Sequence, residues 1–180
     1  AGEILMRLSP AGDERFLQGK NCVRHIGGAE LNVAAGAAQL GIRAGILSKL
    51  PANDIGGYAR NRVRSAGVLD DYLTYDGEKD ARLGVYYYES AANPRKPRVV
   101  YDRSHSSFCK MRPADFPETM YANTRCFHTS GITLALGEEV RDATIEMLKK
   151  FKEQHARISF DVNFRGNLWT GEEARQCMEK

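Results

Sequence analysis

The sequence has few cysteines and no long apolar run. Four cysteines stand at widely separated positions: Cys22, Cys109, Cys126 and Cys177. They form no C-x-x-C pair, so they do not indicate a zinc site or a disulfide framework, and we interpret them as reduced thiols of a cytoplasmic protein. No stretch approaches the roughly 20 apolar residues of a membrane span. The N-terminus also lacks the layout of a signal peptide, so we expect no membrane partner.

A strong charge of one sign is also lacking. The 180 residues include 26 lysines and arginines against 23 aspartates and glutamates, a net charge of +3. The basic residues are dispersed, which argues against a nucleic-acid partner and leaves a modest preference for anionic small molecules. The hydrophobic content of 42% is ordinary for a globular domain that buries one core.

Two common phosphate-binding patterns are absent, but a glycine pair is present. Neither G-x-G-x-x-G nor G-K-[ST] occurs in the chain. Gly27 and Gly28 instead open into an alanine-rich helix, where backbone can approach a ligand closely and the helix N-terminus favours a polar or anionic group. Asn32 is about one turn inside that helix. Taken alone, the pair is more typical of an ordinary turn between a strand and a helix.

Apolar periodicity predicts strands and helices in alternation. We expect strands over 4–8, 42–47, 83–88, 98–101, 125–130 and 157–162, and helices over 28–41, 55–66 and 140–151, with a last helix starting near 170. This alternation predicts an α/β fold with mainly parallel strands.

The strands over 83–88 and 98–101 are expected to form a hairpin connected through 91–94, and Gly131 is expected to open a loop. The helix over 140–151 is expected to bury an apolar face formed by Val140, Thr144, Met147 and Phe151. Within the first helix, small and apolar residues recur at helical spacing, so we expect that stripe to pack on the sheet: Val33, Ala34, Ala37, Ala38 and Leu40.

Tyrosines and an arginine gather on the strands expected near residues 83–101. Alternate residues of a strand share a face, so Tyr101 and Arg103 can point the same way, and Tyr86 lies on the neighbouring strand. A guanidinium beside tyrosine hydroxyls is a good receptor for a carboxylate. An exposed strand with ordinary aromatic cover and a surface arginine is the alternative.

A polar group also follows the strand expected at 157–162. Asp161, Asn163 and Arg165 come at its carboxyl end, where open α/β sheets place their ligands. A purely structural alternative is that Asp161 caps a turn and pairs with Arg165.

These motifs resemble the ribokinase-like (PfkB-type) carbohydrate kinases. The similar segments are Gly27–Gly28 with Asn32, Gly84-Val85-Tyr86, Tyr101-Asp102-Arg103, Ser130-Gly131-Ile132-Thr133 and Asp161-x-Asn163-x-Arg165. Within that family the chain is most similar to the N-terminal half of the 2-keto-3-deoxygluconate kinases. The resemblance implies a three-layer αβα sandwich with a mainly parallel central sheet and a small β-sheet lid. Residues 1–180 would be part of one such domain, with lid strands from about 15–26 and 70–105.

The resemblance also implies roles for individual residues. It implies a sugar site formed by Gly28, Asn32, Tyr86, Tyr101, Arg103, Ile132 and Arg165. The Tyr101-x-Arg103 pair would hold the carboxylate of a sugar acid, and relatives that act on neutral sugars do not need this arginine. Asn163 and Arg165 would also meet the nucleotide phosphates.

The activity implied is transfer of the ATP γ-phosphoryl group to the terminal hydroxyl of a sugar acid, with 2-keto-3-deoxygluconate as the expected substrate and Mg²⁺ as the metal. The aspartate base, the adenine pocket and the magnesium motif are expected beyond Lys180. We therefore expect no catalytic base and no metal ligand in this chain, and no kinase activity from residues 1–180 alone.

Two departures from the family pattern leave alternatives open. Pro51 stands where the broad signature has glycine, and Arg7 stands where neutral-sugar relatives have an acidic ligand. One alternative is a fructokinase or another sugar kinase of the same family. The other is a non-catalytic sugar-binding or dimerising module, since exposed strand edges in the lid would favour a homo-oligomer.

Overall fold

Three pairs of parallel strands form the framework of the computed structural model, which describes residues 1–91 and 93–179. The pairs are β1 (Leu5–Pro10) with β5 (Gly84–Glu89), β3 (Ser48–Pro51) with β4 (Leu73–Asp76), and β7 (Cys126–Ser130) with β8 (Arg157–Asp161). Residues 1–4 link β3 to β7, because the Gly2 N–H donates to the Leu47 carbonyl at 3.1 Å and the Thr129 hydroxyl donates to the Ala1 carbonyl at 3.0 Å. The expectation of mainly parallel core strands is confirmed.

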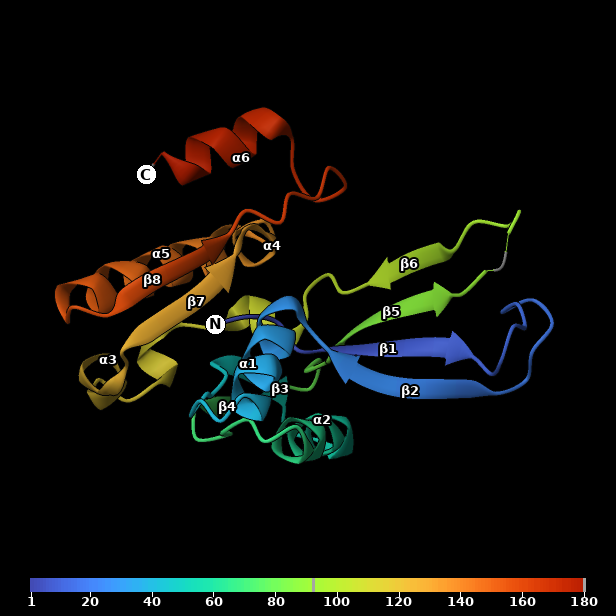
Figure 1. Ribbon diagram of the computed structural model, residues 1–180, viewed down its shortest axis with the longest axis horizontal. Helices are drawn as coiled ribbons and strands as arrows, with labels where there is room; N and C mark the ends of the chain where they lie inside the picture. The colour runs from blue at the N-terminus through green and yellow to red at the C-terminus, as the bar shows by residue number, and fades with distance from the viewer. Residues whose placement is uncertain (92, 180) are drawn as a thin grey trace.

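Helices cover both faces of the part of this framework that contains β3, β4, β7 and β8, whereas β1 and β5 run out from it (Figure 1). One face carries α1 (Ala29–Gln39) and α2 (Asp54–Ser65), and the other carries α3 (Thr119–Asn123), α5 (Glu138–Glu153) and the short 3-10 turns η1 (Ser107–Lys110) and η2 (Pro113–Asp115). Ile46 and Leu47 are consecutive but belong to these two separate apolar clusters. Since successive side chains of extended backbone point to opposite faces, the chain has the expected layered α/β arrangement.

A four-stranded sheet extends away from the helices toward the right of Figure 1. Its order is β2-β1-β5-β6, where β2 (Cys22–Gly27) and β6 (Arg98–Asp102) lie antiparallel to their neighbours. We call this sheet the lid. The second lid segment was expected from about residue 70, but the structure corrects that boundary: β4 pairs with β3, and the lid strands resume at β5. The expected connection over 91–94 includes Ala92, which is outside the described residues.

The first helix buries only part of the expected stripe. Ala34 is buried and Ala38 packs against the same apolar cluster, as expected. Val33 and Leu40 are instead 49% and 82% exposed, and Leu31, which was not in the stripe, is buried. Glu30, directly before Leu31, is also buried, so the side of α1 that faces the protein interior begins with a charged residue. Hydrophobic spacing does not reveal a buried carboxylate such as that of Glu30, so the predicted buried face of the helix differs in part from the observed one.

The strand expected over 42–47 starts later than predicted. Ile46 and Leu47 are buried, as their apolar character predicts, but this stretch forms only an isolated bridge between Gly45 and Leu69. Regular pairing begins where Ser48 stands opposite Leu73 of β4. The chain enters β4 through a turn in which the Leu73 N–H donates to the Asp70 carbonyl.

The C-terminal part follows local sequence signals. The predicted apolar face of α5 is fully buried at Val140, Thr144, Met147 and Phe151. Thr170 and Glu173 form the capping box that opens α6 (Gly171–Met178). Gly131 was expected to open a loop but instead begins the short helix α4 (Gly131–Leu134). Within the described ranges, no helix is both long and apolar enough to cross a membrane.

Candidate functional site

Residues from three distant parts of the chain line one groove. The lining residues are Tyr101, Arg103, Ile132, Arg165, Asn167 and Leu168. Its empty space is about 220 Å³ when the open solvent at its mouth is included, but the room inside the groove is only about 20 Å³, close to that of one water molecule. It lies where the end of β6, the start of α4 and the segment after β8 meet. Four of the residues that the sequence singled out are therefore brought together.

The lid supplies one wall through a cross-strand tyrosine pair. Tyr86 of β5 stands opposite Tyr101 of β6 in the strand register, and their ring centroids are 5.8 Å apart. The Arg103 guanidinium carbon lies 5.8 Å from the centroid of the Tyr101 ring. Tyr86 is not a lining residue, and its ring packs against the ring of Tyr101.

The segment after β8 supplies the opposite wall. The Asp161 carboxylate accepts the Asn163 N–H at 3.0 Å, and Asn163 has a φ of 36°, so the chain turns sharply as it leaves the strand. Asp161 thus caps a turn, as the structural alternative proposed. It does not pair with Arg165, which donates one hydrogen bond to the Phe164 carbonyl at 3.1 Å and makes no ion pair within the described ranges.

A glycine brings α4 close to that segment. A side chain at Gly131 would overlap the carbonyl oxygen of Val162, which follows β8. The lack of a side chain at Gly131 therefore lets the ends of β7 and β8 approach, and Ile132 reaches the same groove as Arg165.

Gly28 and Asn32 do not line the groove. Gly28 has a φ of 153°, and a side chain there would overlap the carbonyl oxygen of Glu3. The close approach at Gly28 is thus to the protein's own backbone, whereas the sequence suggested an approach to a ligand. Asn32 is exposed, and its N–H makes a helical bond to the Gly28 carbonyl at 2.9 Å. Ligand contacts by these two residues stay predictions.

Arg103 has an internal partner that the sequence did not reveal. Its Nε donates to Oε2 of Glu3 at 2.8 Å, and one of its Nη atoms donates to the same oxygen. Glu3 is only 4% exposed, and its Oε1 accepts the Ser106 hydroxyl at 2.5 Å. Burial raises the pKa of the Glu3 carboxyl, although Arg103 and Ser106 oppose that rise. A glutamate directly before an apolar strand was the only signal in the sequence, since buried acids require partners.

A second buried carboxylate, that of Glu30, connects α1 to the segment that carries Ile132. Glu30 accepts the Ser130 hydroxyl at 2.7 Å and the Thr133 hydroxyl at 2.8 Å. Both partners flank Ile132. The start of α1 therefore fixes the turn between β7 and α4, although its glycine pair does not reach the groove.

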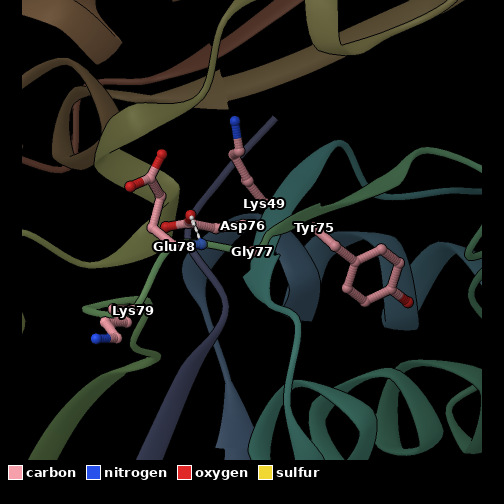
Figure 2. Close-up of a pocket in the computed structure, with 6 residues that line it drawn as sticks. All are labelled: Lys49, Tyr75, Asp76, Gly77, Glu78 and Lys79. Carbon is pink, nitrogen blue, oxygen red and sulfur yellow. Dashed lines mark hydrogen bonds between the residues drawn. The ribbon is translucent and has the colours of Figure 1, made fainter.

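A larger hollow lies elsewhere, at the end of β4. It is lined by Lys49, Tyr75, Asp76, Gly77, Glu78 and Lys79 and holds about 920 Å³ of empty space, much of it open to solvent (Figure 2). The Asp76 carboxylate accepts the Glu78 N–H at 3.1 Å. The Lys49 amine donates to Asp115 at 3.0 Å. The smaller groove is nevertheless the better candidate site, because it brings together Tyr101, Arg103, Ile132 and Arg165, which belong to three separate motifs of the sequence.

Comparison with known proteins identifies relatives over the whole chain. Residues 1–180 match the family described as pfkB family carbohydrate kinase. The 2-dehydro-3-deoxygalactonokinase of Haloferax volcanii is 38% identical over 178 residues, which are 99% of this chain and 55% of that protein.

Solved structures give the same answer. The structure of a 2-dehydro-3-deoxygluconokinase from Thermotoga maritima superposes with a TM-score of 0.93 at 41% identity, covering 99% of this chain and 54% of that one. A sugar kinase of Pyrococcus horikoshii, solved in complex with ATP, shares the fold with a TM-score of 0.85 at 23% identity over 99% of this chain and 57% of its own. The chain spans about half the length of these relatives. By its sequence and by its ribokinase-like α/β fold, the chain belongs to the pfkB family of carbohydrate kinases.

Proposed function

We propose that this chain forms the sugar-binding part of an ATP-dependent kinase that phosphorylates the terminal hydroxyl of a 2-keto-3-deoxy sugar acid, foremost 2-keto-3-deoxygluconate. The observation that supports it best is the convergence of Arg103 and Arg165 with Tyr101 in one groove. A sugar acid has a carboxylate for one guanidinium, and the transferred phosphoryl group supplies negative charge for the other. A neutral hexose offers no such carboxylate.

Each residue then has a part in the reaction. Arg103 and Tyr101 hold the carboxylate end of the substrate, and Ile132 packs against its carbon chain. Arg165, which has no carboxylate partner within the described ranges, stabilises charge on the transferred phosphoryl group together with Asn163. Phosphoryl transfer depends mainly on such positioning and charge stabilisation.

The metal and the base are not assigned to this chain. No group of three or more histidine, cysteine, aspartate or glutamate side chains that could hold a metal ion occurs in residues 1–91 and 93–179. We derive no step through the ion. We propose that the aspartate base, the Mg²⁺ ligands and the adenine pocket are contributed by polypeptide beyond Lys180.

The lid and the cysteines support two further parts of the proposal. β6 is exposed along its whole length and forms one edge of the lid. We propose that the protein associates with a second copy through this sheet, since unpaired edges favour strand pairing.

The four cysteines are all free, which is in keeping with a reducing, cytoplasmic location.

The first prediction concerns substrate preference. The intact protein, meaning the longest polypeptide that its gene encodes, should phosphorylate 2-keto-3-deoxygluconate with a kcat/KM at least about 100-fold above that for fructose or ribose, because a site built for a polar group rejects analogues that lack it. A coupled assay of ADP formation measures this. Equal or higher values with neutral sugars would favour the fructokinase alternative. Binding of sugar acid without any ADP formation would favour the non-catalytic module.

The second prediction concerns Arg103. Arg103→Ala should weaken binding of the sugar acid by about 1.5–3 kcal/mol, the usual value of a hydrogen bond to a charged group, and KM should rise accordingly. Glu3 would lose its partner, but burial already raises the pKa of its carboxyl, so it can take up a proton.

A matched control is available outside the lid. Arg60 of α2 is also paired with a carboxylate, that of Asp70, but it does not line the groove. Arg60→Ala should leave KM for the sugar acid within about twofold of the wild-type value. If Arg103→Ala behaves like Arg60→Ala, Arg103 does not bind the substrate.

A further inference from the structure

In the ion pair between Glu3 and Arg103, both oxygens of the Glu3 carboxylate accept hydrogen bonds. Two guanidinium nitrogens of Arg103, Nε and one Nη, bind the same oxygen of Glu3, and the other carboxylate oxygen accepts the Ser106 hydroxyl. Side-chain exposure is 2% for Glu3 and 11% for Arg103. Because both oxygens of Glu3 are bound, the carboxylate cannot rotate without losing a hydrogen bond, and Arg103 is held by one edge.

Glycines leave room for this carboxylate on two sides. A side chain at Gly84, the first residue of β5, would overlap Oε1 of Glu3 and crowd Cβ of Arg103. A side chain at Gly28 would overlap the Glu3 carbonyl oxygen. The backbone of Glu3 therefore packs closely against Gly28, and its side chain packs against Gly84 and accepts the Ser106 hydroxyl.

The other edge of Arg103 is left for a ligand. Its second terminal nitrogen makes no hydrogen bond within the described residues, and Arg103 lines the groove beside Tyr101 and Arg165. A free arginine side chain would sample several rotamers, and ordering it would weaken ligand binding. Holding one edge of the guanidinium in advance removes that cost.

We propose that Glu3 is a positioning residue for the sugar-acid site: it holds one edge of the Arg103 guanidinium so that the other edge meets the substrate carboxylate. Ser106 supports it by fixing the second carboxylate oxygen. This inference rests on the proposed function. It adds a residue that does not touch the substrate and that acts only through Arg103.

The test is a double-mutant cycle in the intact protein. Glu3→Gln should raise KM for 2-keto-3-deoxygluconate by about tenfold, the effect of one hydrogen bond to a charged group, and should leave kcat and KM for ATP within about twofold. In an Arg103→Met background the same Glu3→Gln change should have no further effect on KM, because the group that Glu3 positions is gone. Asp70→Asn, which weakens the surface ion pair with Arg60, is the matched control and should not change KM.

Ser106→Ala provides a second variant that keeps the ion pair, in case Glu3→Gln does not fold. It should raise KM for the sugar acid severalfold, while thermal unfolding shows that the protein is folded. An unchanged KM in folded Glu3→Gln, or in folded Ser106→Ala where Glu3→Gln is unfolded, overturns the inference. An equal rise of KM in the Arg103→Met background also overturns it, since Glu3 would then act on structure alone. If the wild-type protein does not phosphorylate sugar acids at all, the proposed function has failed first, and this is seen before any variant is made.

Discussion

Replacing Arg165 with alanine should lower kcat of the intact protein by about 10²–10³-fold, the usual effect of removing one preorganised group that stabilises charge in a transition state. Arg165 lines the groove and makes no ion pair within the described part of the chain. Its charge is therefore not shared with a carboxylate of the protein, whereas Arg103 is already paired with Glu3 on one edge. A loss confined to the transition state lowers kcat and kcat/KM together, and steady-state kinetics with varied sugar acid and ATP will show whether this occurs.

Two further variants make the result specific to this position. Arg165→Lys keeps a positive charge but loses the planar fork of donors, so it should recover only part of the activity. Arg157 lies at the opposite end of β8 and is also exposed, so Arg157→Ala should be as active as the wild type. A kcat for Arg165→Ala within twofold of the wild-type value would remove Arg165 from the reaction.

Gly28→Ala should lower the free energy of unfolding by about 3 kcal/mol, in the upper range for a strained backbone position combined with a steric clash. Gly28 has a φ of 153°, and its new methyl group would overlap the carbonyl oxygen of Glu3. Either the turn between β2 and α1 or the start of β1 would have to move. Urea denaturation followed by circular dichroism measures the change.

The neighbouring glycine is the control for this prediction. A side chain at Gly27 would meet no atom within 4 Å, and its φ is outside the left-handed region. Gly27→Ala should therefore change the stability by less than about 0.5 kcal/mol. Because Glu3 holds Arg103, Gly28→Ala should also raise KM for the sugar acid. If the two alanine variants are equally stable, the close approach at Gly28 does not matter to the fold.

Local signals predicted much of the fold. The buried face of α5 and the capping box at Thr170 follow from the spacing of neighbouring residues. Such patterns can be recognised without knowledge of tertiary contacts. The lid hairpin of β5 and β6 was predicted for the same reason. The boundary of β3 was wrong because it depends on where its distant partner β4 begins.

The groove was predicted less completely, for a physical reason. Tyr101, Arg103, Ile132 and Arg165 belong to recognisable motifs, but the pairing of Glu3 with Arg103 joins residues that are 100 positions apart. No local pattern reports such a contact. Asn167 and Leu168 were missed because their positions depend on how the chain packs after β8, where Trp169 is buried against α6.

The most direct test of the account is a crystal structure of the intact protein with 2-keto-3-deoxygluconate bound. We predict that the substrate lies in the groove, with its carboxylate within hydrogen-bonding distance of Arg103 and Tyr101 and its terminal hydroxyl directed toward the Arg165 side. Sugar acid bound instead in the hollow beside Lys49 and Tyr75, or bound in the groove with its carboxylate away from Arg103, would contradict the account.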